Sequence, residues 1–303
     1  MRKLSYGFMS SLKSGLLHPA LELVSHDSTL CLEIREDCIN IYYRGGNIMK
    51  IMELNGNFSA SFDRKYLNQE KTRVPVLPKA LHSLTSIQQW LDAIPLLKHE
   101  MDLWFGEHPK NEREFQQLIV RENNFNNSAK STDYFICDIE YENKDSNGRF
   151  DMIAVYWPSS PSERKNNKNL KIVFIEMKYS DSALTENAGI KDHIQVMTNF
   201  LAVPANLTNL KAEMKEVFNQ KIDLGLIDNQ KPIRNFKDGK PEYIFIFANH
   251  DPGSSVLKRE LRGVPPCPNA DLKFAVSNFM GYGLYKENIY SLADFQERFF
   301  TQI

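Results

Sequence analysis

The sequence predicts an α/β protein whose core has the order helix, three strands, helix and strand, preceded by a β-meander. The core is indicated between Glu112 and Ala248, where runs of β-branched and aromatic residues alternate with helical patterns. The meander is indicated by four short strand-like runs among the first hundred residues. We therefore expect an N-terminal region of residues 1–105 and a second domain of residues 106–303.

Turn residues divide the N-terminal region into strands. The runs are Leu30–Ile34, Ile39–Arg44, Ile48–Leu54 and Phe58–Phe62, separated by Glu36-Asp37, Gly45-Gly46 and Asn55-Gly56-Asn57. Such turns are typical of hairpins. The region could act as a recognition module in which Tyr42, Tyr43 and Arg44 stack on bases. Alternatively, the meander simply packs as part of the fold.

Helical spacing and punctuation predict the remaining elements. We expect helices over residues 87–101, which Pro95 should kink or split, and over 186–201, ending before Pro204. Another helix is expected over 207–220, strands over 243–248 and 272–276, and a last helix that opens at Ser291 with a capping box.

The centre of the chain is a predicted hairpin of two apolar strands, Gly148–Trp157 and Lys171–Tyr179, joined by a long polar loop. Apolar residues on both faces predict strands covered from both sides. Asp151, Glu176 and Lys178 interrupt this pattern, and buried charges are costly unless they are paired or bind a metal. Folding the hairpin evenly about its loop places Asp151 level with the end of the second strand that carries Glu176 and Lys178.

Two carboxylates at one point repel each other unless a cation lies between them, and hard oxygen ligands suit Mg²⁺. Asp151 followed by Glu176-Met177-Lys178 resembles the PD-(D/E)XK nuclease superfamily, whose pattern is an Asp on one strand and Glu-x-Lys on the next. Phe150 stands where the family pattern has Pro.

The resemblance implies a restriction-endonuclease-like αβββαβ core, with a mixed sheet flanked by helices. It also implies phosphodiester hydrolysis that depends on Mg²⁺, with Mn²⁺ as a substitute. Asp151 and Glu176 would bind the metal, with the Met177 carbonyl as a further ligand, and Lys178 would stabilise charge on the phosphate.

A further ligand is expected on the helix that follows Pro109, with Asn111 as its cap. The string Glu112-Arg113-Glu114-Phe115 resembles the opening helix of archaeal-type Holliday junction resolvases, which implies that Glu112 supplies an extra metal-linked carboxylate. Glu114 is the alternative, and either glutamate could instead complement the helix dipole.

Four further features could contribute to a functional site, but each also has a simpler structural interpretation. Asp138 lies on the polar face of a predicted outer strand, where a solvated carboxylate is the simpler interpretation. His193 and Gln195 lie on the helix over 186–201, and we favour a supporting or surface role for His193. The stretch Lys231–Lys240 carries four cations against Asp238 and could either contact phosphates or form a solvated face.

Composition excludes several classes. The chain of 303 residues is 42% hydrophobic, which predicts a globular protein, and its net charge of −1 argues against coating nucleic acid by bulk electrostatics. Its four cysteines form no CxxC pair, which disfavours zinc and a disulfide framework. No stretch reaches membrane-spanning length, so we expect a cytoplasmic protein without a membrane partner.

The sequence thus predicts a Mg²⁺-dependent nuclease with nucleic acid, chiefly DNA, as its partner. The alternatives are a nuclease-fold binding or scaffold protein without turnover, and a structural ion pair between Asp151 and Lys178. The oligomeric state is left open, with a homodimer among the options.

Overall fold

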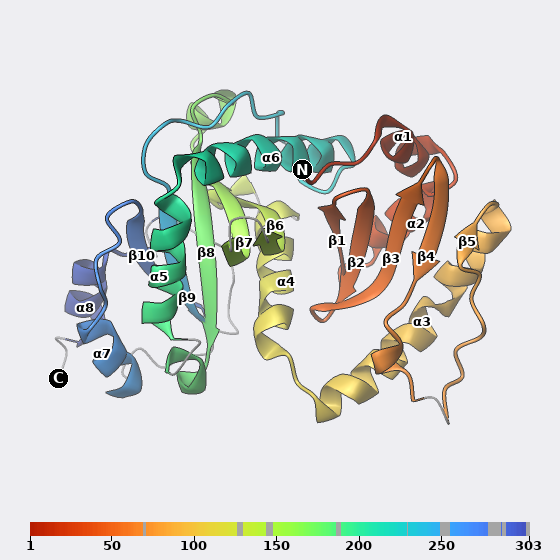
Figure 1. The fold of residues 1–303 in the computed structure, drawn as a ribbon, viewed down its shortest axis with the longest axis horizontal. Helices are drawn as coiled ribbons and strands as arrows, with labels where there is room; N and C mark the ends of the chain where they lie inside the picture. Colours follow the sequence, from red (N-terminus) through yellow and green to blue (C-terminus); the bar gives the residue numbers. More distant parts are fainter. Residues whose placement is uncertain are drawn as a thin grey trace. The chain divides into compact units, whose positions relative to one another are not determined.

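The computed structural model describes residues 1–68, 71–125, 130–143, 148–185, 189–228, 230–248, 255–277, 286 and 289–300. Within these residues, helices combine with two five-stranded sheets (Figure 1), so the α/β class is confirmed. The chain divides into a first unit, Met1–Gln117 with Asn219–Ile227, and a second unit, Leu118–Phe218 with Asp228–Ile303. The border expected between residues 105 and 106 stays a prediction.

The sheet of the first unit is an antiparallel meander in chain order. Its strands are β1 (Leu30–Arg35), β2 (Cys38–Tyr43), β3 (Gly46–Leu54), β4 (Asn57–Ser61) and β5 (Ala80–Leu81). The four predicted runs are therefore confirmed as strands. Helices α1 (Tyr6–Ser14) and α2 (His18–His26) precede them and were not predicted; the Ser5 hydroxyl caps α1 by accepting from the Phe8 amide.

Helix α3 (Leu84–Glu107) is continuous through Pro95, so the expected split at that residue is wrong. Its buried residues include Ile87, Trp90, Leu97 and Met101, and burial of this apolar face outweighs the hydrogen bond that proline removes.

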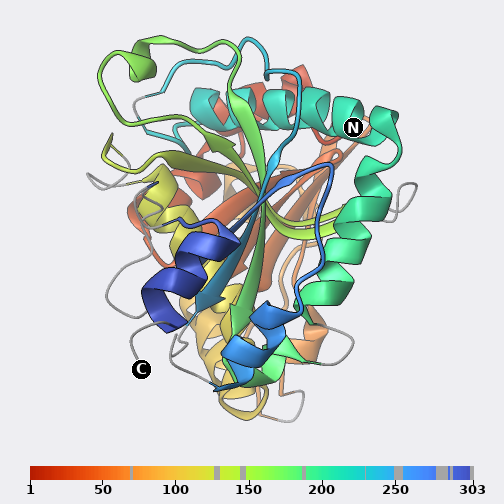
Figure 2. The same ribbon diagram turned by 90° about the vertical axis from the view of Figure 1, so that its left-hand side faces the viewer.

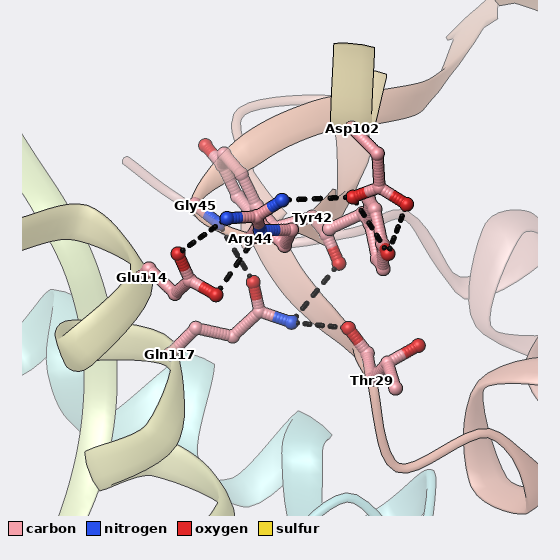
Figure 3. A network of polar contacts seen from close by, with 8 residues as sticks. Thr29, Tyr42, Arg44, Gly45, Asp102, Glu114 and Gln117 are labelled. Carbon is pink, nitrogen blue, oxygen red and sulfur yellow. Dashed lines mark hydrogen bonds and ion pairs between the residues drawn. The ribbon is translucent and has the colours of Figure 1, made fainter. Parts of the chain in front are cut away.

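The turn between β2 and β3 is packed in the first unit rather than presented to a partner. Arg44 forms ion pairs with Asp102 (2.9 Å) and with Glu114 (3.1 Å) (Figure 3). Its guanidinium lies over the Phe105 ring. The Tyr43 hydroxyl donates to Asp102 at 3.1 Å. These side chains are already engaged, which favours the packing interpretation of the turn over base stacking.

The sheet of the second unit has the order β10-β9-β8-β7-β6, with β8 in the middle (Figures 1 and 2). Its strands are β6 (Tyr134–Asn143), β7 (Gly148–Tyr156), β8 (Lys171–Tyr179), β9 (Glu242–Ala248) and β10 (Asp271–Ser277). Strands β6, β7 and β8 pair antiparallel, whereas β8, β9 and β10 run parallel. The sheet is therefore mixed.

Helices α5 (Ile190–Leu201), α7 (Ser255–Arg262) and α8 (Leu292–Phe300) belong to the second unit, while α4 (Asn111–Asn124) and α6 (Pro204–Asp223) each continue from one unit into the other. Short 3₁₀ helices occur at Arg64–Tyr66, Glu163–Lys165 and Asp181–Leu184. The order from Asn111 onward is helix α4, strands β6, β7 and β8, helices α5 and α6, and strand β9. The restriction-endonuclease-like core expected from the sequence stays a prediction. The first part of the predicted helix over 186–201 falls on residues 186–188, outside the described residues.

Strand β6 lacks the solvated polar face that the sequence predicts for it at Asp138. The pairing with β7 shifts register between Ile136 and Asp138, which indicates a bulge at Cys137. Asp138 is fully buried, so its interpretation as a solvated carboxylate is wrong. Asn124 from α4 binds the main chain beside this bulge, because its amide donates to the Ile136 carbonyl and its carbonyl accepts from the Ile136 amide.

Aromatic side chains hold the helices on the second sheet. Phe200 of α5 contacts Phe150 and Phe174, with ring centroids 5.2 and 5.9 Å apart. Phe295 of α8 packs against Phe247 of β9, and the Ser291 hydroxyl accepts from the Asp294 amide at the start of α8, as the predicted cap requires. No helix among the described residues is both long enough and apolar enough to cross a membrane.

A pair of glycines tests the close packing of the β2–β3 turn. Gly45 and Gly56 both have positive φ, of 74° and 75°. A Cβ on Gly45 would lie 2.6 Å from the main-chain carbon of Arg113, whereas a Cβ on Gly56 would meet nothing within 4 Å. Gly56→Ala should therefore cost only the left-handed penalty of about 1 kcal/mol. Gly45→Ala should cost at least about 2 kcal/mol more in denaturant unfolding. Equal losses would contradict the packed turn.

Candidate functional site

The hairpin brings Asp151 to the residues that follow Ile175. The register pairs Met152 with Ile175, and one further step along the strands sets Asp151 opposite Glu176. The Met177 amide donates to Asp151 Oδ2 at 2.8 Å. The predicted convergence of Asp151 with the Glu176–Lys178 end of β8 is therefore present, with a register one residue from the even fold expected from the sequence.

Glu176 is the centre of a buried polar cluster with Lys178 and His193. Lys178 Nζ donates to Glu176 Oε1 at 3.1 Å, and His193 Nδ1 lies 2.8 Å from the same oxygen. Lys178 Nζ also lies 2.9 Å from His193 Nε2. An ammonium can only donate, so Nε2 must accept, and this network assigns the hydrogen of the ring to Nδ1, which donates to Glu176.

Burial and charge act in opposite directions on Glu176, whose side chain is 2% exposed. Burial raises the pKa of this carboxyl, but the His193 hydrogen bond and the Lys178 charge outweigh it and hold the pKa below its ordinary value. The carboxylate is therefore ionised at neutral pH. His193 is 25% exposed and Asp151 is half-buried, so solvent reaches the cluster at these two residues.

Two buried polar atoms, one in the cluster and one on the neighbouring strand β9, lack a hydrogen-bond partner among the described residues. They are the second carboxylate oxygen of Glu176, Oε2, and the hydroxyl oxygen of Tyr243 on β9. Burial and the charges of Glu176 and Asp151 raise the pKa of Tyr243 well above its ordinary value, so both carboxylates lie within electrostatic reach of this hydroxyl. Buried polar groups are normally satisfied, and such a gap is typical of a place that holds water or an ion.

The opposite end of β8 provides an internal comparison. There Lys171 pairs with Glu242 at 3.1 Å and with Asp271 at 2.7 Å, and the Tyr134 hydroxyl donates to the other oxygen of Glu242 at 3.0 Å. Both oxygens of Glu242 are therefore engaged. Strand β8 carries buried charge near both ends, but only the Glu176 carboxylate retains a buried oxygen without a partner among the described residues.

Backbone strain accompanies the cluster. Glu140 lies across from Asp151 on β6, between the pairs Ile139–Met152 and Tyr141–Phe150, and has a φ of 51°. Ser180 follows β8 with φ 63° and ψ 172°, a conformation that is essentially confined to glycine. Strained residues of this kind cluster at functional sites, where the surrounding structure holds them.

The donor set fits Mg²⁺ better than a softer metal. No group of three or more His, Cys, Asp or Glu side chains forms a ready cage among the described residues. Mg²⁺ needs no such cage, because it keeps several waters and binds through one or two carboxylates and substrate phosphates. Asp151 and the unpartnered oxygen of Glu176 supply that kind of ligand, and the Met177 carbonyl would be the third candidate.

The remaining candidates belong to the helices α4 and α5. Glu112 is in the first turn of α4 and belongs to the first unit, so its role as a metal ligand stays a prediction. Glu114 is held by the guanidinium of Arg44 through two hydrogen bonds, of 3.1 and 3.3 Å (Figure 3). Gln195 donates to Asn199 on the exposed side of α5.

Sequence reasoning left two contributors unassigned. His193 was interpreted as a supporting or surface residue, and Tyr243 only as part of a buried strand. The hydrogen bond of His193 to Glu176 and the electrostatic effect of Glu176 on Tyr243 connect separate elements, and a single sequence carries no pairing signal for them. A histidine in the first turn of the helix that follows Glu-x-Lys is the nearest usable signal.

A groove of about 580 Å³ lies in the first unit, between β4, residues 72–79 and α3. Its described lining is mostly apolar, with Arg64 and Lys79 as its cations, and contains no Asp, Glu, His or Cys. It therefore offers no acid–base or metal-binding set, and the candidate site rests on the cluster around Glu176.

The His193 contacts can be measured through stability in metal-free buffer. Phe and Asn have similar helix propensities, but only Asn keeps a donor near the position of Nδ1. His193→Phe should lower the free energy of unfolding by about 1.5 kcal/mol, because hydrogen bonds to charged groups contribute this much. His193→Asn should lose less than half of that.

Gln195→Ala on the same helix is the control and should change stability by no more than about 0.5 kcal/mol. Urea unfolding in EDTA measures all three variants. If His193→Phe were as stable as the parent, the histidine would contribute nothing to holding Glu176.

Comparisons of this chain with protein-family models, with curated proteins and with solved structures found no match. The chemistry of the site is therefore argued from its own residues.

Proposed function

We propose that this protein is a metal-dependent nuclease that hydrolyses phosphodiester bonds in DNA. The observation that carries the proposal is the state of Glu176. One of its oxygens is fixed by Lys178 and His193, while the other is buried without a partner among the described residues, beside a strand that carries Asp151. Two carboxylates and an ammonium at adjoining strands are the groups that phosphodiester hydrolysis requires.

The strand arrangement supports the proposal. Three antiparallel strands, β6, β7 and β8, follow helix α4, and helices α5 and α6 lead from β8 to the parallel strand β9. Without α6, this is the order αβββαβ. A restriction-endonuclease-like core has this order of elements, as the resemblance of Asp151 and Glu176-Met177-Lys178 to PD-(D/E)XK nucleases implies. The candidate residues lie on its two central antiparallel strands.

Each residue has a distinct role in the proposed mechanism. Asp151 and Glu176 would hold Mg²⁺, with the Met177 carbonyl and Glu112 as further candidate ligands. When bound, the metal polarises the phosphate and lowers the pKa of a water molecule. The Met177 amide orients the Asp151 carboxylate through its 2.8 Å hydrogen bond.

Lys178 serves as an electrostatic group rather than a base. Its ammonium has three N–H donors, of which Glu176 and His193 engage two. The third is left to bind an oxygen of the phosphate as negative charge develops there.

A binding or scaffold protein without turnover is the alternative. It would share the fold and the nucleic-acid partner, but it gives no reason for an unpartnered carboxylate oxygen in a buried strand. The other alternative is the purely structural ion pair expected from the sequence between Asp151 and Lys178. It gives no reason for Glu176, of which Lys178 satisfies one oxygen and not the other. Cleavage assays separate these alternatives from the nuclease.

Cleavage should require both the metal and the charge of Asp151. We expect the protein to cut plasmid, linear or single-stranded DNA with Mg²⁺ or Mn²⁺ and not with EDTA. Asp151→Asn keeps an oxygen that accepts from the Met177 amide but removes a metal-binding charge. It should therefore fold normally and cleave at least about a hundredfold more slowly. Equal cleavage by the two proteins, purified identically, would reveal a contaminant and reject the assignment.

Glu112 and Glu114 should separate by what each change affects. On a helix these residues point about 200° apart. Because Glu114 is engaged by Arg44, Glu114→Gln should cost about 1 kcal/mol of stability and leave cleavage nearly unchanged. Glu112→Gln should slow cleavage at least about tenfold with little loss of stability. Arg44→Gln is the control: it removes the partner of Glu114 together with the ion pair to Asp102, so it should lose at least as much stability as Glu114→Gln and leave cleavage nearly unchanged. The reverse order of cleavage rates in the two glutamate variants would move the ligand to Glu114.

A further inference from the structure

Two loops of the second unit are joined into one ordered surface where β8 begins. Residues 166–170 lead into β8, and residues 231–237 lie between α6 and β9. Figure 2 shows both loops at the top of this sheet, in green and in light blue. Hydrogen bonds cross-link them, among them those from the Arg234 amide to the Asn167 carbonyl (2.9 Å), from the Lys237 amide to the Leu170 carbonyl (2.9 Å), and from the Asn235 side-chain amide to Asn169 Oδ1 (2.7 Å).

Buried side chains and a neighbouring helix fix this surface further. Ile233 and Phe236 are 2% and 9% exposed and anchor the second loop. The amine of Lys211, on α6, donates to the Lys237 carbonyl at 2.8 Å. Residues 231–237 are therefore held in a defined conformation. They belong to the stretch that the sequence predicts either to contact phosphates or to form a solvated face, and the main-chain positions of its cations are fixed.

The surface is strongly basic. Six cations from the two loops and their flanks are exposed, and we call them the basic ridge: Lys165, Lys168, Lys231, Arg234, Lys237 and Lys240. The acidic residues in the same stretches are Glu163 and Asp238. Among the described residues, no carboxylate forms an ion pair with any of the six. The ridge is thus a local positive surface on a chain whose net charge is −1.

The chemistry of the ridge fits a nucleic-acid backbone. Stable binding at a membrane surface usually adds an apolar face to the charges, but Ile233 and Phe236 are buried and Pro232 is the one apolar residue of the second loop that is exposed. With no exposed aromatic ring in these two loops, there is nothing on which bases could stack. Lysine, arginine and asparagine side chains are the usual partners of phosphate oxygens.

We propose that the basic ridge binds the phosphate backbone of duplex nucleic acid, without regard to its sequence. This inference rests on the proposed function for the identity of the polyanion and assigns it a second contact surface. Glu176 lies six residues along β8 from Leu170, which corresponds to about 20 Å at the rise of a strand. The phosphates that the ridge binds are therefore not the phosphate at the candidate site.

The basic ridge is tested by measuring the binding of duplex DNA under conditions that prevent cleavage. Fluorescence anisotropy with a labelled duplex of about 20 base pairs, in EDTA and on the Asp151→Asn background, measures affinity between about 50 and 200 mM salt. The ridge variant carries Lys231→Ala, Arg234→Ala and Lys237→Ala. Its control carries Lys71→Ala, Arg73→Ala and Lys110→Ala, which remove the same charges from exposed positions of the first unit.

The ridge variant should bind at least about tenfold more weakly at the lowest salt concentration. The slope of log affinity against log salt should decrease by about three, because each lost phosphate contact removes about 0.9. The control should stay within about twofold of the parent, and circular dichroism should show all proteins folded. The pair Lys168→Gln and Lys240→Gln tests the same surface without touching the cross-linked residues and should weaken binding in the same direction.

Several results would overturn the proposal: no binding by the parent, equal binding by the ridge variant, or equal losses in ridge variant and control. Tighter binding to vesicles of anionic phospholipid than to duplex would also overturn it, since the partner would then be a membrane surface. Cleavage by the unmodified protein is scored separately. If the unmodified protein cleaves DNA but the ridge variant binds duplex as well as the parent, only the ridge proposal is rejected. If the ridge variant binds duplex more weakly than the parent but the unmodified protein cleaves no DNA, only the nuclease proposal is rejected.

Discussion

The cost of burying charge in β8 is the constraint around which the second unit is arranged. A strand covered on both faces excludes water, and each ion held there without a good partner costs several kcal/mol. At the start of β8 the protein meets this cost internally, because Lys171, Glu242 and Asp271 satisfy one another. At its end, Lys178 and His193 satisfy only half of the Glu176 carboxylate. One strand therefore shows both a completed ion cluster and an incomplete one.

Much of this arrangement could be predicted from local patterns. Apolar residues on both faces of the segment now seen as β8 predicted its central place, and the long polar loop placed Asp151 within one residue of its observed register. Prediction failed where a long-range contact overrides a local rule. The bulge at Cys137 reverses the alternation in β6 and buries Asp138, and tertiary packing carries α3 through Pro95. Neither effect has a signature in the neighbouring residues.

The candidate site was predictable in its residue types but not in its connections. Charges within apolar strands identified Asp151, Glu176 and Lys178, since charge burial is improbable without a purpose. The contacts of His193 and Tyr243 join elements far apart in the sequence, and only the folded chain shows them. The turn at Gly45 is similar. Gly45 and Gly46 predicted a hairpin, but the close approach of Arg113, which requires glycine at position 45, is a tertiary feature.

The half-satisfied carboxylate bears on the choice between a structural and a chemical role. Replacing a buried ion pair by apolar residues of similar volume is often neutral or stabilising, and Ile172 and Phe174 show that this strand accommodates such residues. A structural role therefore gives no advantage to Glu176 over an apolar side chain. A bound ligand does give one, because any group that binds the folded state alone adds stability that grows with the logarithm of its concentration over its dissociation constant. A bound cation would complete the cluster at Glu176 in the way that Lys171 completes Glu242, and it would also place a positive charge where a phosphodiester can be polarised.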